Sequence, residues 1–426
     1  MPNPVPIIVV GMGERASVYA SEALSHPDWF QIVGVADVDS RRIHQAQNMF
    51  NIPDRHCFAS VEELVSFPRF AVAVINGTMD RLHVPTSLPL LRHGYDILLE
   101  KPFATCEEEA ELLLRCTRET GQNVMVCHVL RYSPFYRKIK EALTGGEIGD
   151  VINIHMAEQV SFFHHSVSYV RGKYASPELC GSGMLLSKCS HDLDIMAWLL
   201  DNIHPVSVSS VGSQFQFRPE MAPENSGSHC LLNCPIERNC IFSARRLYVE
   251  HPQRWANNIW RAYDSQADSD EEKIRILSAP GHPFSRCVYR CNIPIVDHQS
   301  LLINFSNGAT GTFSMNGGAA DSNRHIHITG TRGEISGSFN KQRFTISHID
   351  PKMPQGRHIQ TVDVTELQKG NAHGGGDQAI VKDFIAMVKG EKVSICHTTL
   401  EDSMIGHRLI FLAEKSRERG GKLQYY

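Results

Sequence analysis

Two segments of the sequence carry residue types that together can remove a hydride and a proton from an alcohol. Lys101 follows the apolar run 95–99, and His191 opens a helical segment that also carries Asp194. A lysine ammonium can hydrogen-bond a substrate hydroxyl and stabilise alkoxide character while hydride leaves the carbon. An imidazole, with an ordinary pKa of about 6.5, suits removal of the hydroxyl proton. We therefore predict that Lys101, His191 and Asp194 are catalytic.

The segment around His191 has two helical faces. His191, Asp194 and Trp198 recur at i, i+3 and i+7 on one face, while a separate apolar stripe runs along the other. One face can bury the helix while the other presents the imidazole, with Asp194 near it to bind or orient substrate. A histidine alone is more often structural, so this prediction depends on its pairing with Lys101.

A glycine-rich turn near the N-terminus predicts a dinucleotide site. Gly11, Gly13 and the small Ala16 follow an apolar strand and open a helix. The first glycine permits a tight turn, the second lets a pyrophosphate approach the backbone, and the helix N-terminus supplies oriented amides. We predict that this turn, with Glu14 and Arg15, binds the cofactor.

The second strand ends at Asp37, whose carboxylate can accept the ribose hydroxyls of the adenosine half and would repel a 2′-phosphate. This residue favours NAD. Arg41 and Arg42 follow closely and could instead clasp a 2′-phosphate, so NADP is the less favoured alternative.

Hydrophobic patterns alternate between strand and helix in the first part of the chain, which predicts βαβ units and a parallel sheet. The expected strands there are 6–10, 31–36, 71–75, 96–99 and 123–127. Ser60 with Glu63, and Thr105 with Glu108, fit the capping-box spacing at two helix starts. Because ligands bind at the carboxyl edge of such a sheet, Glu100 and Lys101 are also predicted to face the cofactor.

After about residue 149 the pattern changes to longer alternating stretches that predict antiparallel strands. The expected strands are 151–160, 301–305, 309–315, 324–329 and 343–349, and the expected helices are 187–200, 375–388 and 399–415. Asn307-Gly308 signals a two-residue hairpin. The irregular stretch 218–293 is interpreted as an insertion or lid.

Length and composition set the class of protein. At 426 residues, two domains are expected, and we place a Rossmann domain at 1–128 and a substrate-binding α/β domain at 129–426. A net charge of −4 without a basic block argues against nucleic-acid or lipid binding. The sequence shows neither a signal peptide nor an apolar run of about 20 residues, so we expect a cytoplasmic protein without membrane spans.

The insertion gathers five of the twelve cysteines. Cys230, Cys234, Cys240 and Cys287 could close a tetrahedral zinc site. Their spacings lack paired C-x₂-C knuckles, so packed thiols are favoured over zinc and no metal is assigned.

Several of these segments together resemble the glucose–fructose oxidoreductase/inositol dehydrogenase (Gfo/Idh/MocA) family. The resemblance is carried by the segments 11–16, 78–83, 100–102, 181–194 and 330–335 and by Asp37, and it spans nearly the whole chain. It implies a Rossmann domain, a second α/β domain with an open, mostly antiparallel sheet, NAD(P), a sugar-like or cyclitol substrate, and assembly as a dimer or tetramer. It also implies that Lys101 is the catalytic lysine, His191 the acid/base, and Thr78 and His83 neighbours of the nicotinamide.

The chain departs from that family at one position. Many members carry an aspartate four residues before the histidine, whereas this chain has Ser187 with Lys188 beside it. Either Asp194 or Asp192 takes part of that role, or Lys188 adds positive charge suited to an anionic substrate.

Polar residues between the two catalytic segments are candidates for the substrate pocket. These are His128, Arg131, Tyr132, Glu158, His164, Tyr169, Arg171, Lys188 and His373. The planar guanidinium of Arg171 suits a carboxylate, sulfonate or phosphate, although pairing with a structural acid such as Glu158 is an equal alternative. His373 precedes a helix, and a plain helix-entry loop competes with a role in the pocket.

Three functions are compatible with these residues. The favoured one is an NAD-dependent oxidoreductase acting on a sugar, sugar acid or cyclitol. The main alternative is a redox-assisted glycosidase, in which transient oxidation of a ring hydroxyl permits elimination of the aglycone before water addition and reduction. The third is a cofactor-binding regulator without catalysis, against which the presence of Lys101 and His191 argues.

Overall fold

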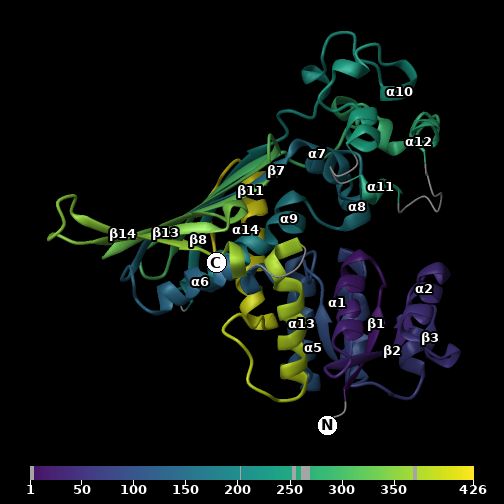
Figure 1. Cartoon of the computed structure of the whole chain (residues 1–426), viewed down its shortest axis with the longest axis horizontal. Coiled ribbons are helices and arrows are strands. Elements are labelled where there is room, and N and C mark those ends of the chain that lie inside the picture. Colours follow the sequence, from purple (N-terminus) through teal and green to yellow (C-terminus); the bar gives the residue numbers. More distant parts are fainter. Residues whose placement is uncertain (1–3, 202, 252–255, 261–268, 368–371) are drawn as a thin grey trace.

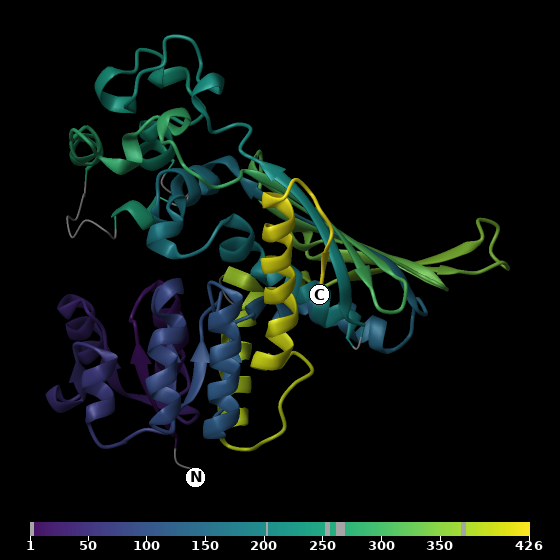
Figure 2. The same ribbon diagram turned by 180° about the vertical axis from the view of Figure 1, so that it is seen from behind.

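The computed structural model describes residues 4–201, 203–251, 256–260, 269–367 and 372–426, with a few side chains, that of His373 among them, left out. Figures 1 and 2 show an N-terminal α/β layer structure, a large sheet beside it, and a lobe of short helices above the two. Among the described residues, no helix is both long and apolar enough to cross a membrane.

The first sheet is parallel throughout, in the order β3-β2-β1-β4-β5-β6. Its strands are β1 (Val5–Val10), β2 (Phe30–Ala36), β3 (Cys57–Phe58), β4 (Ala73–Asn76), β5 (Asp96–Leu99) and β6 (Val124–Val126). The helices that connect them are α1 (Glu14–Ser25), α2 (Ser40–Phe50), α3 (Val61–Ser66), α4 (His83–Arg92) and α5 (Glu107–Thr120). The strand order reverses between β1 and β4, which is the point where doubly wound sheets bind dinucleotides.

The strands of this sheet are nearly continuous apolar runs because helices cover both faces of it. In β1, Ile7, Ile8 and Val9 are fully buried, and β4 is buried along its whole length. Consecutive side chains of a strand point to opposite faces, so Ile7 and Val9 belong to one hydrophobic cluster and Ile8 to another. Because all six strands run parallel, their carboxyl ends lie at one edge of the sheet.

The second sheet has nine strands in the order β14-β13-β12-β11-β7-β10-β9-β8-β15, with every adjacent pair antiparallel except β7 with β10. The strands are β7 (Val151–Ser161), β8 (Pro205–Ser213), β9 (His298–Phe305), β10 (Thr310–Ala319), β11 (Asn323–Gly330), β12 (Gly333–Ser338), β13 (Arg343–Ile349), β14 (Arg357–Asp363) and β15 (Gln424–Tyr425). The helices that follow or cover it are α6 (Pro134–Thr144), α7 (Phe162–His165), α8 (Pro177–Cys180), α9 (Met184–Leu200), α13 (Gly376–Val388) and α14 (Leu400–Glu418). The expected fold class, a Rossmann domain plus an α/β domain with an open, mostly antiparallel sheet, is therefore confirmed.

Residues 214–297 connect the neighbouring strands β8 and β9 and form the upper lobe in Figure 1. The short helices α10 (Cys230–Asn233), α11 (Asn257–Trp260) and α12 (Asp270–Leu277) lie in it. Leu247, Tyr248 and Leu277 are fully buried within a small hydrophobic cluster of its own. This cluster also includes Val167, while Phe242 and Tyr289 of the lobe belong to the main hydrophobic core.

The last two long helices return to the first domain. Thr398 binds β6 through two hydrogen bonds: the Val126 amide donates to its carbonyl over 3.1 Å, and its hydroxyl donates to the Val126 carbonyl over 2.6 Å. Arg15 of α1 forms an ion pair with Asp377 of α13 at 2.5 Å. Figure 2 shows α14 standing between the two sheets.

The structure differs from the sequence expectations in local detail. The expected two-residue hairpin at Asn307-Gly308 is wrong, because the loop has three residues: Phe305 pairs with Ala309, and only Gly308 has a positive φ, at 87°. Helix α5 starts one residue later than the capping pattern indicated. Cys106 is its N-cap, and the amide and hydroxyl of Thr105 donate to Glu109.

Candidate active site

The glycine turn and the loop after β4 face each other across the point where the strand order reverses. Gly11 has a φ of 75°, and a Cβ placed on it would lie 2.7 Å from the backbone nitrogen of Thr78. Gly13 caps α1 with extended backbone and has no side-chain cap. The turn therefore needs glycine at position 11 and leaves the amides at the start of α1 available to an anion.

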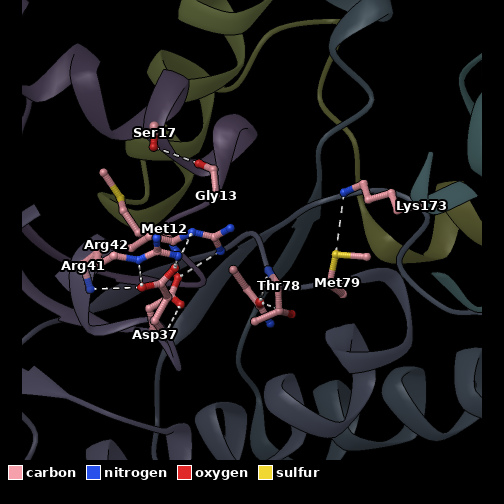
Figure 3. Close-up of polar contacts among 11 residues, drawn as sticks. Met12, Gly13, Ser17, Asp37, Arg41, Arg42, Thr78, Met79 and Lys173 are labelled. Atoms are coloured by element: carbon pink, nitrogen blue, oxygen red, sulfur yellow. Dashed lines mark hydrogen bonds and ion pairs between the residues drawn. The ribbon is translucent and has the colours of Figure 1, made fainter. Parts of the chain in front are cut away.

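Asp37 lies beside this turn with its carboxylate held in place. Its Oδ2 accepts the Met12 amide at 2.7 Å, and its Oδ1 accepts the Asp39 amide at 2.8 Å. The residue is only 6% exposed, and the half-exposed Arg42 lies 3.6 Å from Oδ2 (Figure 3). A carboxylate oriented in this way, with lone pairs left over, suits the vicinal hydroxyls of a ribose.

Arg41, which the sequence offered as a cofactor ligand, pairs instead with Asp39 of its own turn. Its Nε and Nη2 contact the two oxygens of Asp39 at 3.0 and 2.9 Å. Arg42 is the arginine that approaches Asp37 (Figure 3).

Arg15 and Glu100 contact each other, which differs from their expected role as direct cofactor ligands. Glu100 Oε1 accepts from Arg15 Nε at 3.3 Å and from the Tyr19 hydroxyl at 2.7 Å, and its Oε2 accepts the Lys101 amide at 2.9 Å. Arg15 also bonds Asp377. Glu14 begins α1 beside them. The network joins α1, the end of β5 and α13, so its evident role is to hold the loop that carries Lys101.

Thr78 and His83 stabilise the loop after β4. The hydroxyl of Thr78 donates to Asn76 at 2.9 Å. The two ring nitrogens of His83 lie 2.7 Å from the Pro102 carbonyl and 3.0 Å from the Thr78 carbonyl. His83 thus links the loop after β4 to the loop after β5, and its ring is engaged by backbone on both sides.

Lys101 emerges at the carboxyl end of β5 and reaches α9 of the second domain. Its Nζ donates to the Ser187 carbonyl at 2.6 Å. Burial lowers the pKa of Lys101 below its ordinary value, and Lys188 and Arg15 act in the same direction, while Glu100 and Asp80 oppose them. Burial therefore disfavours the charged form of this side chain, which lies near the boundary between the domains.

His191 lies one helical turn beyond that contact. In a regular helix the carbonyl of residue i accepts the amide of residue i+4, so the Ser187 carbonyl that receives Lys101 also belongs to the turn that ends at His191. The imidazole is 7% exposed. The structure thus brings Lys101 and His191 to the same turn of α9.

A second buried histidine stands behind His191. The rings of His128 and His191 lie 5.9 Å apart in an edge-to-face arrangement, and His128 Nε2 is 3.6 Å from Asp194. Burial lowers the pKa of His128 far below its ordinary value, with Arg131 and Lys101 adding to the effect. His128 is fully buried, so it supports His191 and is not a surface of the substrate pocket.

Asp194 does not have the catalytic or substrate-binding role that the sequence suggested. Its Oδ2 accepts Arg131 Nε at 2.7 Å and its Oδ1 accepts Arg131 Nη2 at 2.5 Å, and each residue is 1% exposed. Arg131 also donates to the His397 carbonyl at 3.1 Å. The pair is a buried bidentate ion pair, so Arg131 is structural as well. Tyr132 is likewise occupied, since its hydroxyl donates to Asp383 at 2.7 Å.

Glu158 and Lys188 form part of a four-residue charge network across β7, α9 and β11. Lys188 Nζ lies 3.2 Å from Glu158 Oε1, and Arg324 Nε lies 2.9 Å from Glu158 Oε2 and 2.8 Å from Asp192 Oδ1. Burial raises the pKa of Glu158, while Arg324 and Lys188 lower it. Two cations meet two carboxylates, so Lys188 does not add an excess positive charge to the site.

His164 and Tyr169 line the same region from α7 and the turn after it. Their ring centroids lie 6.1 Å apart, and the two residues are 7% and 3% exposed. Burial lowers the pKa of His164 far below its ordinary value, and the charges of Lys188, Arg324 and Lys101 act in the same direction. His164 is therefore a neutral imidazole beside the cations of the site.

The contacts of Arg171 differ from the substrate-binding role expected for it. It is 2% exposed and donates to the Arg286 carbonyl at 2.8 Å, the Tyr248 hydroxyl at 2.9 Å and the Phe242 carbonyl at 3.0 Å, all in the upper lobe. Its hydrogen-bond partners therefore come from the lobe and not from Glu158. The side chain of His373 lies outside the described residues.

Sequence reasoning missed two residues of the site. Arg324, the second residue of β11, had no signal beyond its charge. Tyr174 follows Lys173, whose Nζ reaches Met79 Sδ at 3.6 Å (Figure 3). The ring of Tyr174 stacks on Tyr169 at 5.5 Å, and Asp80, Glu100 and Glu14 act electrostatically on its hydroxyl. The position of Tyr174 between the domains depends on how its loop folds. The spacing of residues in the sequence therefore could not reveal it.

Comparison with known families and proteins agrees with this geometry. Residues 5–128 match the family model GFO_IDH_MocA, described as an oxidoreductase family with an NAD-binding Rossmann fold. Residues 140–424 match the model of the C-terminal α/β domain of the same family.

Similar proteins include the Bacillus subtilis protein named oxidoreductase YteT, 24% identical over 393 residues that cover 89% of this chain and 88% of that protein. An inositol 2-dehydrogenase of Rubrobacter xylanophilus is 24% identical over 46% of this chain and 52% of its own length. Among solved structures, a levoglucosan dehydrogenase in complex with NADH superposes with a TM-score of 0.71 at 15% identity, covering 99% of each chain. An inositol dehydrogenase homologue of Azotobacter vinelandii complexed with NAD⁺ gives 0.70 at 15% identity, covering 100% of this chain and 98% of that one. The structural likenesses establish the fold.

Proposed function

The chain belongs to the GFO_IDH_MocA oxidoreductase family, with an NAD-binding Rossmann domain, and from that premise we propose that it moves hydride between NAD and a hydroxyl or carbonyl of a sugar, sugar acid or cyclitol. One observation carries the proposal: Lys101 Nζ contacts the Ser187 carbonyl at 2.6 Å, one helical turn before His191. We infer that Lys101 and His191 serve one reacting position at the carboxyl edge of the nucleotide-binding sheet.

The residues of the first domain fit the coenzyme. A Cβ on Gly11 would lie within 3 Å of the Thr78 backbone, and the buried Asp37 carboxylate is already oriented by two amides. Gly11, Gly13 and the start of α1 would hold the pyrophosphate, and Asp37 would hold the adenosine ribose. When bound, NAD supplies the hydride acceptor for alcohol oxidation or the hydride donor for carbonyl reduction.

The proton chemistry belongs to Lys101 and His191. Lys101 donates a hydrogen bond to the reacting oxygen and stabilises the negative charge that develops there. His191 takes the hydroxyl proton in oxidation and returns it in reduction. Asp194 and Arg131 hold α9 from behind, and the Glu100 network holds the loop of Lys101. In the proposed reaction, these supports orient the two groups toward one oxygen.

A polyhydroxylated substrate suits the rest of the site. His164, Tyr169 and Lys188 offer hydrogen-bonding atoms around the reacting position, and the charges of Lys188 and Arg324 are balanced by Glu158 and Asp192. A neutral sugar or cyclitol therefore needs no further counter-ion. Relatives named inositol 2-dehydrogenase and the fold shared with levoglucosan dehydrogenase support this choice.

The test is a panel of sugars, sugar acids and cyclitols incubated with NAD. We expect stoichiometric NADH with at least one member, and a loss of about 10²–10⁴-fold in kcat for Lys101→Ala with the Kd for NAD little changed. Lys138→Ala is the matched control, since Lys138 is an exposed lysine of α6 paired with Glu141 at 2.7 Å. Full activity of Lys101→Ala would contradict the proposal.

His164 favours a second candidate, the redox-assisted glycosidase. After a ring hydroxyl is oxidised, the adjacent C–H becomes acidic, and a second base can remove that proton while the bond to the aglycone breaks. Water then adds, and return of the hydride restores the sugar. The imidazole of His164 is 7% exposed and lies 6.1 Å from the ring of Tyr169 in the same region. Its lowered pKa keeps it in the unprotonated form that can accept a proton, but also makes it a weak base.

The two candidates are separated by the fate of the hydride and of the adjacent proton. A glycosidase releases a chromogenic aglycone only when NAD is present, leaves no net NADH, and exchanges the adjacent C–H with deuterated water. His164→Asn should stop that exchange, whereas His155→Asn, which alters an exposed histidine of β7 bonded to Thr312, should not. Net NADH without C–H exchange selects the simple dehydrogenase.

A further inference from the structure

Residues 172–183 of the second domain pass over the carboxyl edge of the first sheet. This segment, the strap, runs from Gly172 through the short helix α8 to Gly183, which is the N-cap of α9. Figure 1 shows α8 above the first sheet, and doubly wound sheets bind dinucleotides at the carboxyl ends of their strands. The strap therefore lies on the side of the second domain that faces the coenzyme site.

Two hydrogen bonds fasten the strap to the turn that follows β4. The Ser182 hydroxyl donates to Asp80 Oδ2 at 3.0 Å, and the two residues are only 3% and 6% exposed. Arg81 Nη2 donates to the Pro177 carbonyl at 2.8 Å. Each bond has one charged partner, which makes it stronger than a bond between neutral groups. The strap is thus held by two consecutive residues of the first domain.

Close packing brings the strap against a second loop of the first domain. Gly181 has a φ of 87°, and a Cβ on it would lie within 3 Å of both Arg81 Cγ and Thr105 Cγ2. Thr105 lies in the loop after β5. Toward the other end of the strap, Lys173 Nζ lies 3.6 Å from Met79 Sδ (Figure 3). The strap therefore contacts the loops that follow two neighbouring strands.

The strap also has bonds within itself. The thiol of Cys180 is fully buried and lies 3.3 Å from the Ser176 carbonyl and 3.2 Å from the Ser182 carbonyl. These contacts close residues 176–182 into one compact turn. Segments that keep their internal bonds move as units, with the change of backbone angles taken up by a few residues at their ends. We therefore expect the strap to detach as a whole.

Tyr174 extends the strap toward the opposite wall of the coenzyme site. Burial raises the pKa of Tyr174, and the carboxylates of Asp80 and Glu14 act in the same direction. Asp80 follows β4, whereas Glu14 begins α1 directly after the glycine turn. The phenol is thus within electrostatic range of both sides of the point where the strand order reverses. The strap spans the place where the dinucleotide is held.

We propose that the strap is a gate for the coenzyme, which must leave the turn after β4 before NAD can enter or leave the first domain. The bonds of Asp80 and Arg81 hold this gate closed. They join protein to protein and do not involve NAD, so they favour the closed gate equally with and without coenzyme. Weakening them should therefore speed binding and release by the same factor. The inference uses the coenzyme site of the family and does not depend on the identity of the substrate.

The test is stopped-flow fluorescence of NADH with the full-length protein and no substrate. Mixing protein with NADH gives the association rate constant, and displacing bound NADH with excess NAD gives the dissociation rate constant. Ser182→Ala removes a buried bond to a carboxylate and should raise both constants by about ten- to a hundredfold. Arg81→Ala loses a more exposed bond and should raise both by about two- to tenfold. The Kd for NADH should stay the same in both variants.

Arg69→Ala is the matched control. Arg69 is also an exposed arginine of the first domain, and its Nη1 donates to the Gly94 carbonyl at 2.7 Å, but both residues precede strands and so lie at the amino edge of the sheet. This variant should leave both rate constants unchanged. Far-UV circular dichroism reports whether each variant is folded, and Arg81→Ala, altered at an exposed position, supplies the test if Ser182→Ala does not fold.

Two results would overturn the proposal. Wild-type rate constants in folded Ser182→Ala and Arg81→Ala would show that the strap does not limit exchange of the coenzyme. Faster release without faster binding, with a correspondingly weaker Kd, would show that these residues act on the bound coenzyme and not on a gate. Because no substrate is present, the outcome is independent of whether any sugar or cyclitol is converted.

Discussion

Replacing Asp194 by asparagine should damage stability far more than catalysis. The carboxylate receives two charge-assisted hydrogen bonds from Arg131, at 2.7 and 2.5 Å, and each residue is 1% exposed. Asp194→Asn keeps the shape of the side chain but leaves the guanidinium without its counter-charge. Because the pair joins α9 to the segment after β6, the change loosens the support of His191 without removing a group that touches substrate.

The expected cost follows from the burial. Removing one partner of a buried ion pair costs about 3–5 kcal/mol, since the remaining charge is left uncompensated. At 1.4 kcal/mol for each factor of ten, the equilibrium between folded and unfolded protein shifts by more than about a hundredfold. The double variant Arg131→Met/Asp194→Leu removes both charges and should recover most of the loss, because apolar replacement of a buried pair is often near neutral.

Urea unfolding followed by tryptophan fluorescence measures this cost, since the ring of Trp198 lies 5.7 Å from the Arg131 guanidinium carbon. Asp201→Asn is the control. Asp201 sits at the end of the same helix with a side chain 71% exposed, 3.7 Å from Lys140. Lys140 is buried and also donates to the Trp198 carbonyl at 2.7 Å, so loss of the exposed carboxylate should cost at most about 1 kcal/mol. The kcat of folded Asp194→Asn should stay within about tenfold of wild type. A variant as stable as wild type, but with a kcat reduced more than a hundredfold, would refute the structural assignment of Asp194.

Three further predictions concern the coenzyme site and pH. Asp37→Ala should weaken NAD binding by about ten- to a hundredfold in calorimetric titration, as expected when hydrogen bonds to a charged group worth about 1.5–3 kcal/mol are lost; unchanged affinity would exclude Asp37 from the ribose site. Gly11→Ala should abolish NAD binding, because the φ of 75° and the Thr78 backbone 2.7 Å from the new Cβ admit no side chain. Burial lowers the pKa of His165 to about 4 and of His407 to about 3, so between these values and about pH 6.5 the unfolded chain binds more protons than the folded one. Stability should then fall with falling pH through that window, by up to about 1.4 kcal/mol per unit for each histidine, and a flat urea midpoint from pH 7 to 5 would contradict this.

The fold followed from the sequence because its strands are long enough to show their pattern. The parallel strands are buried on both faces and read as apolar runs, and the long helices α9, α13 and α14 begin and end within three residues of the expected positions. Strands β3, β8, β12, β14 and β15 were not among those expected. β3 has only two residues, and β14 is exposed at all but one position, so its place depends on pairing with β13 and not on burial.

Only part of the site could be predicted, and the reason differs from the one that applies to the strands. Lys101 and His191 stand at element boundaries, where residue type and position together indicate a role. Asp194 and Arg171 have the same chemistry as functional residues, yet their partners, Arg131 and the backbone of the lobe, come from segments more than 60 and 70 residues away. Spacing cannot reveal whether a charge is already neutralised by a distant partner.

Because the C-terminal segment returns to β6, this strand is synthesised long before the residues that cover it. Strand β6 lies at the edge of the first sheet, and its open side is closed by Thr398 through bonds at 3.1 and 2.6 Å to Val126. During synthesis, more than 270 residues separate the emergence of that edge from the emergence of its cover. Until then the ribosome-bound nucleotide domain presents an unpaired strand to its surroundings. Expression of the first 128 residues alone should therefore yield a protein prone to association, whatever its affinity for NAD.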